Sequence, residues 1–266
     1  MPAALKLQEE FGDTLQTVFV EVGRASSDKM QAFAIDKGWF GGDGASQAIW
    51  TKERPFDVGT GSIPAFALMD ENGKVLLSGT TTRMHSEIEE TIEQYAKASK
   101  KAPKDLPKAV GKLQVDFFKG KLGAALNAAR DLAEVPNTRD AEVQPAAIAA
   151  VERFETKLKR ELKRADWLID KGFFAVAEAD LKDLQKGLKG CDEYLDMVAE
   201  RLDTLESDEL KSERAAEDAL TKLEKKLYTK GTDKVKSKSL TQLAEKYPGT
   251  RAAERAQALV AVVEAG

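Results

Sequence analysis

The chain has 266 residues, 42% of them hydrophobic and 32% charged, which is typical of folded protein with many solvated helices and is enough for two domains. Its formal net charge of −4 provides no general attraction to nucleic acid or to an anionic membrane, so we expect a protein or peptide partner and no nucleic acid. No apolar run approaches the roughly 20 residues that span a bilayer, and the first residues lack the features of a signal peptide, so we expect no transmembrane segment and, for the sequence as it stands, a cytoplasmic protein.

The first part of the chain alternates between helical and extended patterns. Hydrophobic periodicity and turn residues predict, in order, a helix over 3–11, a strand over 17–22, a helix over 26–37 and a glycine-rich loop over 38–44. Either Ser26 or Ser27 can cap the second of these helices. The apolar stripe of that helix is predicted to consist of Met30, Phe33 and Ala34.

A β-hairpin is predicted next. The apolar runs 65–69 and 74–77 flank residues 70–73, whose sequence is Asp-Glu-Asn-Gly. Asn-Gly between two apolar runs favours a tight hairpin, because both residues tolerate the positive φ that the turn requires. A helix over 84–95 follows, and together these elements indicate an α/β layer.

A change in composition marks a domain boundary at residues 97–107, a polar stretch with two prolines. We therefore expect an α/β domain over 1–96, a linker over 97–107 and an all-helical domain over 108–266. Within and just before the last segment, the periodicity predicts helices over 106–118, 121–134, 143–171, 173–188, 190–205, 208–228, 235–246 and 251–264.

An internal similarity relates residues 119–132 to residues 171–184. Gly120 aligns with Gly172, and Ala125 aligns with Ala177. A glycine that ends one helix, followed five residues later by a small residue, lets the next helix pack closely in a helical hairpin. This spacing resembles the turn between the helices of tetratricopeptide repeats.

A second stretch points in the same direction. Residues 247–250, Tyr-Pro-Gly-Thr, precede an alanine-rich helix and resemble the junctions of envelope-associated tetratricopeptide proteins, with Thr250 as the expected N-cap. We therefore expect a helical-repeat module that binds a partner.

The α/β part resembles the thioredoxin-like fold, in its bacterial thiol-disulfide oxidoreductase branch. The resemblance rests on residues 1–13, on the strand that follows, and above all on residues 62–79, Ser-Ile-Pro-Ala-Phe-Ala-Leu-Met-Asp-Glu-Asn-Gly-Lys-Val-Leu-Leu-Ser-Gly. In that family the proline before the hairpin is typically cis and lies against the redox cysteines. The resemblance thus implies that Ile63 and Pro64 form a substrate-binding cis-proline loop; an ordinary trans proline is the alternative.

The cysteines that this family uses are missing from the chain. Its single cysteine, Cys191, excludes an internal disulfide, a Cys-x-x-Cys pair and a cysteine zinc site, and we interpret it as a structural thiol rather than a reactive one. By the resemblance, Met1 falls just after the expected cysteine pair, and the strand that would precede the pair is missing. We expect a truncated start; the alternatives are a strand supplied by another chain and a fold that has diverged. An upstream signal segment would place the protein in the bacterial envelope or periplasm, and an open sheet edge would allow self-association.

The sequence gives little support for metal binding, phosphate binding or binding of nucleic acid or lipid. The only histidine, His85, has no second histidine or cysteine nearby, and the glycines of 38–61 match no phosphate-binding motif. The lysine-rich stretch 225–238 is interpreted as a solvated segment, with a nucleic-acid or lipid patch as the alternative. The sequence therefore predicts no catalytic residue, cofactor or metal ligand.

Two functions remain open. The first is that of a thioredoxin-like protein related to thiol-disulfide oxidoreductases, without the redox dithiol in this chain and with a helical-repeat module that binds a partner. The second is that of a redox-inactive scaffold with no enzymatic role.

Overall fold

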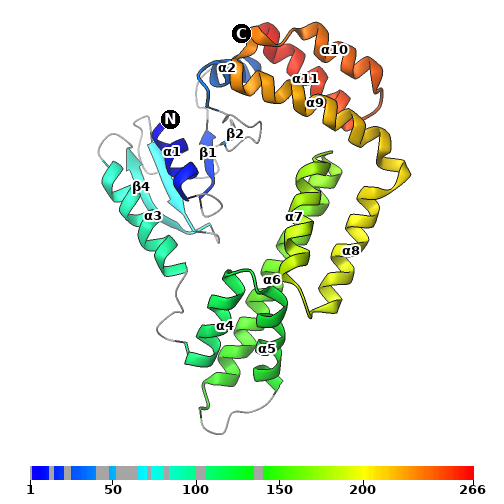
Figure 1. Ribbon diagram of the computed structural model, residues 1–266. Coiled ribbons are helices and arrows are strands. Elements are labelled where there is room, and N and C mark those ends of the chain that lie inside the picture. The colour runs from blue at the N-terminus through cyan, green and yellow to red at the C-terminus, as the bar shows by residue number, and fades with distance from the viewer. Residues whose placement is uncertain are drawn as a thin grey trace. The chain divides into compact units, whose positions relative to one another are not determined.

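The computed structural model describes residues 2–11, 15–20, 25–39, 48–51, 65–70, 73–80, 84–99, 106–134 and 140–266 (Figure 1). The chain divides into two compact units. The first unit comprises Met1–Ser99, Thr221–Thr241 and Gln257–Gly266, and the second comprises Lys100–Leu220 and Gln242–Ala256. The first break falls inside the predicted linker, although α3 extends to Ser99 and takes in its first residues.

The α/β part of the first unit has the predicted order of elements, with one strand in addition. Its elements are α1 (Pro2–Phe11), β1 (Thr17–Val20), α2 (Ser27–Asp36), β2 (Ala48–Thr51), β3 (Ala65–Met69), β4 (Val75–Thr80) and α3 (His85–Ser99). A small-sheet part followed by helices is therefore confirmed as the coarse architecture.

The additional strand is β2, which lies parallel to β1. Thr17 is opposite Ala48 and Val20 is opposite Thr51, with α2 in the connection between the two strands. Two parallel strands require such a crossover connection, because a tight turn can join only antiparallel strands. This strand is not among the elements predicted from the sequence, although its Ile-Trp-Thr run is rich in strand-favouring residues.

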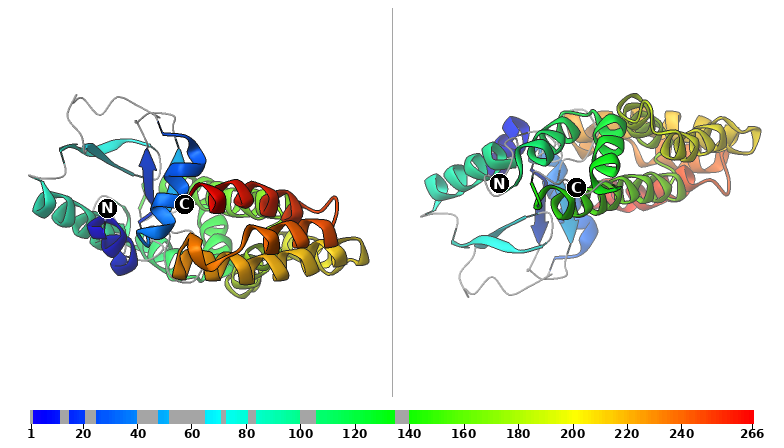
Figure 2. Two further views of the ribbon diagram at one scale, coloured as in Figure 1. Left: turned by 90° about the horizontal axis from the view of Figure 1, so that it is seen from above. Right: turned by 90° about the horizontal axis from the view of Figure 1, so that it is seen from below.

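The predicted hairpin is confirmed. β3 and β4 pair antiparallel, with Ala65 opposite Thr80, and α3 packs against β4 (Figure 2). At the turn, Gly73 has φ 81°, and the backbone N–H of Lys74 donates to Oδ1 of Asp70 at 2.9 Å. Gly73 is needed at this position because a side chain is strained at positive φ.

Helix α2 begins as predicted but buries a different face. The Ser26 hydroxyl caps it by accepting a hydrogen bond from the Lys29 N–H at 3.4 Å. Its buried residues are Ala32, Ala34 and Ile35, whereas Phe33 is 45% exposed. The prediction of Phe33 in the apolar stripe is therefore wrong, because the small alanines and Ile35 supply the packed face.

The two strand pairs form separate sheets. Among the described residues, β1 pairs only with β2, and β3 pairs only with β4. The pattern leaves one edge of β1 and one edge of β3 without a ladder of hydrogen bonds. A direct pairing of β1 with β3 would have refuted the interpretation that a strand is missing between them, and no such pairing is present in the part of the chain that the structure describes.

All eight predicted helices after residue 106 are present, with ends that differ by at most three residues. They are α4 (Lys108–Phe118), α5 (Leu122–Glu134), α6 (Val143–Asp170), α7 (Phe174–Gly187), α8 (Asp192–Glu206), α9 (Lys211–Lys230), α10 (Ser237–Lys246) and α11 (Arg251–Ala265). Two short 3₁₀ turns, η2 (Asp208–Leu210) and η3 (Thr232–Lys234), flank α9.

The core of the second unit is built by α4 to α8. Helices α4, α5 and α6 pack against one another, α7 packs on α6, and α8 packs on α7 (Figures 1 and 2). At its centre the rings of Phe117 and Phe154 stack with centroids 4.0 Å apart and planes within 4° of parallel. Both side chains are 1% exposed, so this pair lies in a dry, close-packed interior.

The helical hairpins turn at the predicted glycines. Gly120 has φ 87° and Gly172 has φ 73°, so both adopt the left-handed conformation that commonly ends a helix. The aligned residues Ala125 and Ala177 are buried, as expected if each lets the following helix approach closely. The hairpin geometry is thus confirmed, while the resemblance to tetratricopeptide repeats stays a prediction.

Candidate functional site

The predicted cis-proline loop cannot be described. Ile63 and Pro64 lie outside the described residues, so their role in substrate binding stays a prediction. His85 begins α3 and is exposed, with its Nδ1 3.5 Å from a carboxylate oxygen of Glu89. This exposed pair one helical turn apart has the geometry of an ordinary surface interaction.

Cys191 lies in the core of the second unit. It is 3% exposed and sits immediately before α8, and burial raises the pKa of its thiol. A thiol that stays protonated is a poor nucleophile, which favours the structural interpretation. Among the described residues no group of histidine, cysteine and carboxylate side chains is arranged to hold a metal ion.

A pocket of about 600 Å³ opens in the second unit, beside the C-terminal end of α6 and the N-terminal end of α11. It combines an aromatic surface with three acidic and three basic side chains. Its lining residues are Trp167, Asp170, Lys171, Phe173, Glu213, Gly249, Arg251, Glu254 and Arg255. We call it the Trp167 pocket.

Aromatic rings form the apolar part of the Trp167 pocket. Trp167 is 54% exposed, and its ring stacks near-parallel on that of Phe173, with centroids 6.2 Å apart. The guanidinium carbon of Arg255 lies 4.2 Å from the centroid of the Phe173 ring. This short cation–π contact stabilises the position of the Phe173 ring, on which Trp167 stacks.

Arg255 is positioned by the end of α6. Its Nη1 donates to the carbonyl oxygen of Gly172 at 3.0 Å and lies 3.5 Å from that of Lys171. A cation is favoured here because the last carbonyls of a helix carry partial negative charge. Through this hydrogen bond to Gly172, the turn at the end of α6 fixes the position of Arg255 in the pocket wall.

The start of α11, which also lines the pocket, is fixed by a carboxylate. Glu213 accepts hydrogen bonds from the backbone N–H of Arg251 at 3.0 Å and from its guanidinium Nη1 at 2.9 Å. The predicted N-cap of α11 is confirmed alongside, because Thr250 Oγ1 accepts from the Ala253 N–H at 3.1 Å. The start of α11 is thus held from two sides before any ligand binds.

The charges around the Trp167 pocket balance. Asp170 pairs with Lys171 at 2.8 Å, and the hydrogen bond from this lysine lowers the pKa of the Asp170 carboxyl. Glu213 neutralises Arg251, as described above. A neutral pocket with an exposed indole suits an apolar or aromatic side chain, with polar groups at the rim for the backbone beside it.

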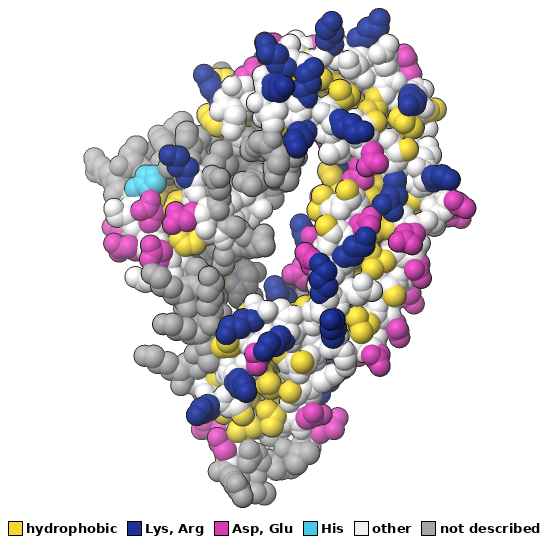
Figure 3. All heavy atoms as spheres, viewed as in Figure 1, with side chains coloured by type: hydrophobic (Ala, Val, Ile, Leu, Met, Phe, Trp, Pro, Cys, Tyr) yellow, Lys and Arg dark blue, Asp and Glu magenta, His cyan; other side chains and the backbone are white. Residues whose placement is uncertain are grey.

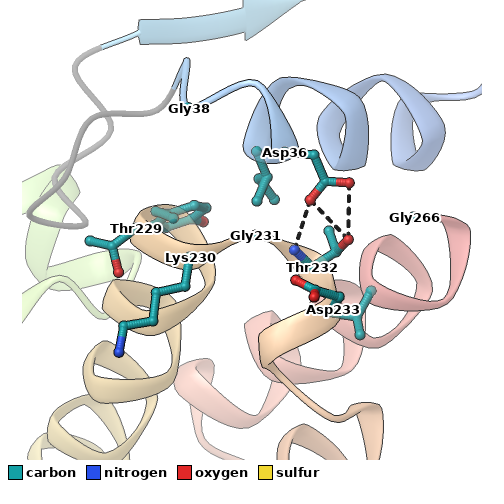
Figure 4. A pocket seen from close by; sticks show the side chains of 11 residues that line it. Asp36, Gly38, Thr229, Lys230, Gly231, Thr232, Asp233 and Gly266 are labelled. Atoms are coloured by element: carbon teal, nitrogen blue, oxygen red, sulfur yellow. Dashed lines mark hydrogen bonds between the residues drawn. The ribbon is translucent and has the colours of Figure 1, made fainter.

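A second pocket, of about 430 Å³, lies within the first unit (Figure 4). Asp36, at the end of α2, points toward η3 and accepts hydrogen bonds from the Thr232 N–H at 2.8 Å and from its hydroxyl at 2.9 Å. Lys230 also lines this pocket, but its side chain points away from Asp36 in Figure 4. Because the Asp36 carboxylate already binds Thr232, we interpret these hydrogen bonds as structural contacts between α2 and η3.

The Trp167 pocket is not predicted from the sequence. Its residues come from three segments, 167–173, 213 and 249–255, and only packing brings them together. The available signal was the aromatic residue Trp167 on an otherwise charged helical stretch, three residues before the helix end.

Comparisons with protein-family models, with curated proteins and with solved structures found no match. In the part of the chain that the structure describes, no helix has the length and apolarity needed to cross a bilayer.

Proposed function

We propose that the helical part of this protein binds a partner protein through a short peptide segment, and that the Trp167 pocket receives one of its apolar or aromatic side chains. The observation that carries the proposal is the half-exposed Trp167, stacked on Phe173 beside the anchored Arg255. Tryptophan and arginine dominate binding energy at protein interfaces, and a side chain this apolar is costly to leave in water.

The rigidity of the pocket supports this proposal. Arg255 is held by the carbonyls at the end of α6, and Arg251 is held by Glu213. A wall that is ordered before binding loses little conformational entropy when a ligand arrives, so more of the contact energy appears as affinity.

We further propose that the α/β part belongs to the thioredoxin-like proteins related to thiol-disulfide oxidoreductases. The order helix, strand, helix, strand, hairpin, helix supports this, as does the unpaired edge of β1 and of β3 among the described residues. In this proposal the chain as given supplies partner binding rather than redox turnover.

The alternative, a redox-inactive scaffold, is favoured by the buried position of the single cysteine. One thiol cannot resolve its own mixed disulfide, so we expect no steady-state reduction of a model disulfide. Turnover that is abolished by Cys191→Ser would contradict both this expectation and the scaffold interpretation.

Selection from a random peptide library tests the binding proposal. The full chain is immobilised for selection, and the enriched peptides are then measured on Trp167→Ala. We expect an enriched motif with an apolar or aromatic residue, bound at least about tenfold more weakly by Trp167→Ala, as is typical of hot-spot truncation. Ile148→Ala is the matched control, because Ile148 lies on the same helix and is 53% exposed. Equal loss in both variants, or no enriched motif, would contradict the proposal.

A further inference from the structure

A strongly basic surface lies on the first unit and borders the pocket at Asp36. Residues 221–241 hold seven lysines against two carboxylates, a local charge of +5, whereas the whole chain carries −4. All seven lysines are exposed: Lys222, Lys225, Lys226, Lys230, Lys234, Lys236 and Lys238. We call these residues the lysine surface.

Helix geometry gathers four of the lysines on one side of α9. At 3.6 residues per turn, positions 222, 225, 226 and 230 fall within an arc of about 140° and extend about 12 Å along the axis. Of the other three, Lys234 ends η3, Lys236 immediately precedes α10 and Lys238 lies in the first turn of α10. Lys and Arg side chains crowd the surface over α9 and α10 in Figure 3.

Within the part of the chain that the structure describes, few carboxylates pair with these lysines. Among the ion pairs of the described residues, only Lys234 of these seven takes part, with Asp233 at 2.6 Å. The lysine surface therefore creates a positive potential in the solvent around it. This potential attracts a polyanion that comes within roughly a Debye length.

The apolar residues between the lysines are turned inward. Leu227, Val235 and Leu240 are each 3% exposed or less. Tyr228 is the single aromatic residue of the stretch and is only partly exposed. The surface consequently offers charge but neither an apolar wedge for a bilayer nor a ring for stacking on bases.

We propose that the lysine surface binds duplex nucleic acid through its phosphate backbone, without reading the base sequence. The high, regular charge density of a duplex matches a row of lysines, and phosphate contacts alone suffice for binding of this kind. The charge of the whole chain predicted no such partner, but association depends on the local field, and the carboxylates that make the total negative lie elsewhere in the sequence. An anionic membrane fits less well, because stable attachment needs a second, apolar anchor.

The test is binding of a labelled, random-sequence duplex to the full chain, followed by fluorescence anisotropy at about 50 and about 200 mM salt. The variant replaces Lys222, Lys225, Lys226 and Lys230 by glutamine. The control replaces Lys108, Lys163, Lys189 and Lys211 by glutamine, which changes the net charge equally at exposed lysines of the second unit.

We expect the variant to lose at least about tenfold in affinity at the lower salt, with a shallower salt dependence by about two to four in log–log slope, and the control to change less than about twofold. Circular dichroism checks that both variants stay folded. Absence of duplex binding, or equal loss in the two variants, would overturn the proposal. So would binding to phosphatidylserine vesicles without duplex binding, or displacement of the duplex by polyglutamate at matched charge.

Discussion

The helices α4 to α8 and the strands β1 to β4 differ in how completely their side chains are buried. The helices enclose a continuous core in which Phe117, Phe154, Leu126 and Leu158 are 1% exposed or less. The strands form two separate pairs in the described residues, and β3 leaves every residue half-buried or exposed. Each helix satisfies most of its own backbone hydrogen bonds, whereas a two-stranded sheet leaves one edge of each strand unpaired and is only marginally stable alone.

This difference indicates which part of the chain is stable on its own. We expect the second unit to hold its structure without help from the first, because its core and the hydrogen bonds of its helices lie within the unit. The α/β part depends on contacts beyond its own strand pairs. The following predictions test or refine that contrast, beginning with the largest effect.

Phe154→Ala is expected to lower the free energy of unfolding of the second unit by about 3–5 kcal/mol, since it removes a buried ring and leaves a cavity beside Phe117. Urea denaturation measures the loss. Hydrogen exchange locates it: exchange should accelerate across α4–α8 while the β3–β4 hairpin stays as in the wild type. Equal acceleration in both places would mean that the chain unfolds as a single cooperative body.

Gly123→Ala is expected to destabilise the second unit by about 1–2 kcal/mol, although alanine is the better helix former by about 1 kcal/mol. A Cβ at Gly123 would lie 2.5 Å from the carbonyl oxygen of Leu188, so the end of α7 would have to move. Thermal or urea denaturation provides the measurement. A gain in stability would show that α5 and α7 pack more loosely than described.

Gly172→Val is expected to cost about 1–2 kcal/mol, because a β-branched residue is disfavoured at φ 73°. Its Cβ would also lie 2.8 Å from Cβ of Arg251, whereas a Cβ at Gly120 meets nothing within 4 Å. Gly120→Val is therefore the matched control and should cost less. Equal losses of stability in the two variants would mean that backbone strain accounts for the whole effect and that the contact with Arg251 contributes nothing.

Alkaline pH should weaken the second unit through Tyr194. This side chain is 2% exposed, and burial raises its pKa from 10.0 to about 12. Because the folded pKa is the higher one, its contribution to stability is complete below pH 10.0 and is lost as pH rises toward about 12. Tyr194→Phe should flatten the fall in urea midpoint over that interval. An unchanged pH profile would contradict this role.

The sequence predicts the helices well because their signals are local. The positive φ at Gly120 and Gly172, the hairpin turn at Gly73 and the cap at Thr250 all follow from residue types within a few positions. Each is a backbone requirement that few other residues meet.

The sequence does not predict the features that depend on distant partners. Strand β2 exists through its pairing with β1, some thirty residues earlier, and its four residues are too few for a periodic signal. The face that α2 buries was mispredicted at Phe33 because the small residues beside it pack more closely. The Trp167 pocket requires residues 213 and 255 to meet residue 167, which only tertiary packing achieves.

The fluorescence of Trp167 tests the proposed binding site most directly. Trp39 and Trp50 are replaced by phenylalanine, which leaves Trp167 as the single indole of the chain. On titration with a selected peptide, we predict a saturable shift of its emission to shorter wavelength, because the ligand covers a ring that is 54% exposed. A peptide that binds with the same affinity and leaves this emission unchanged would contradict the assignment of the Trp167 pocket.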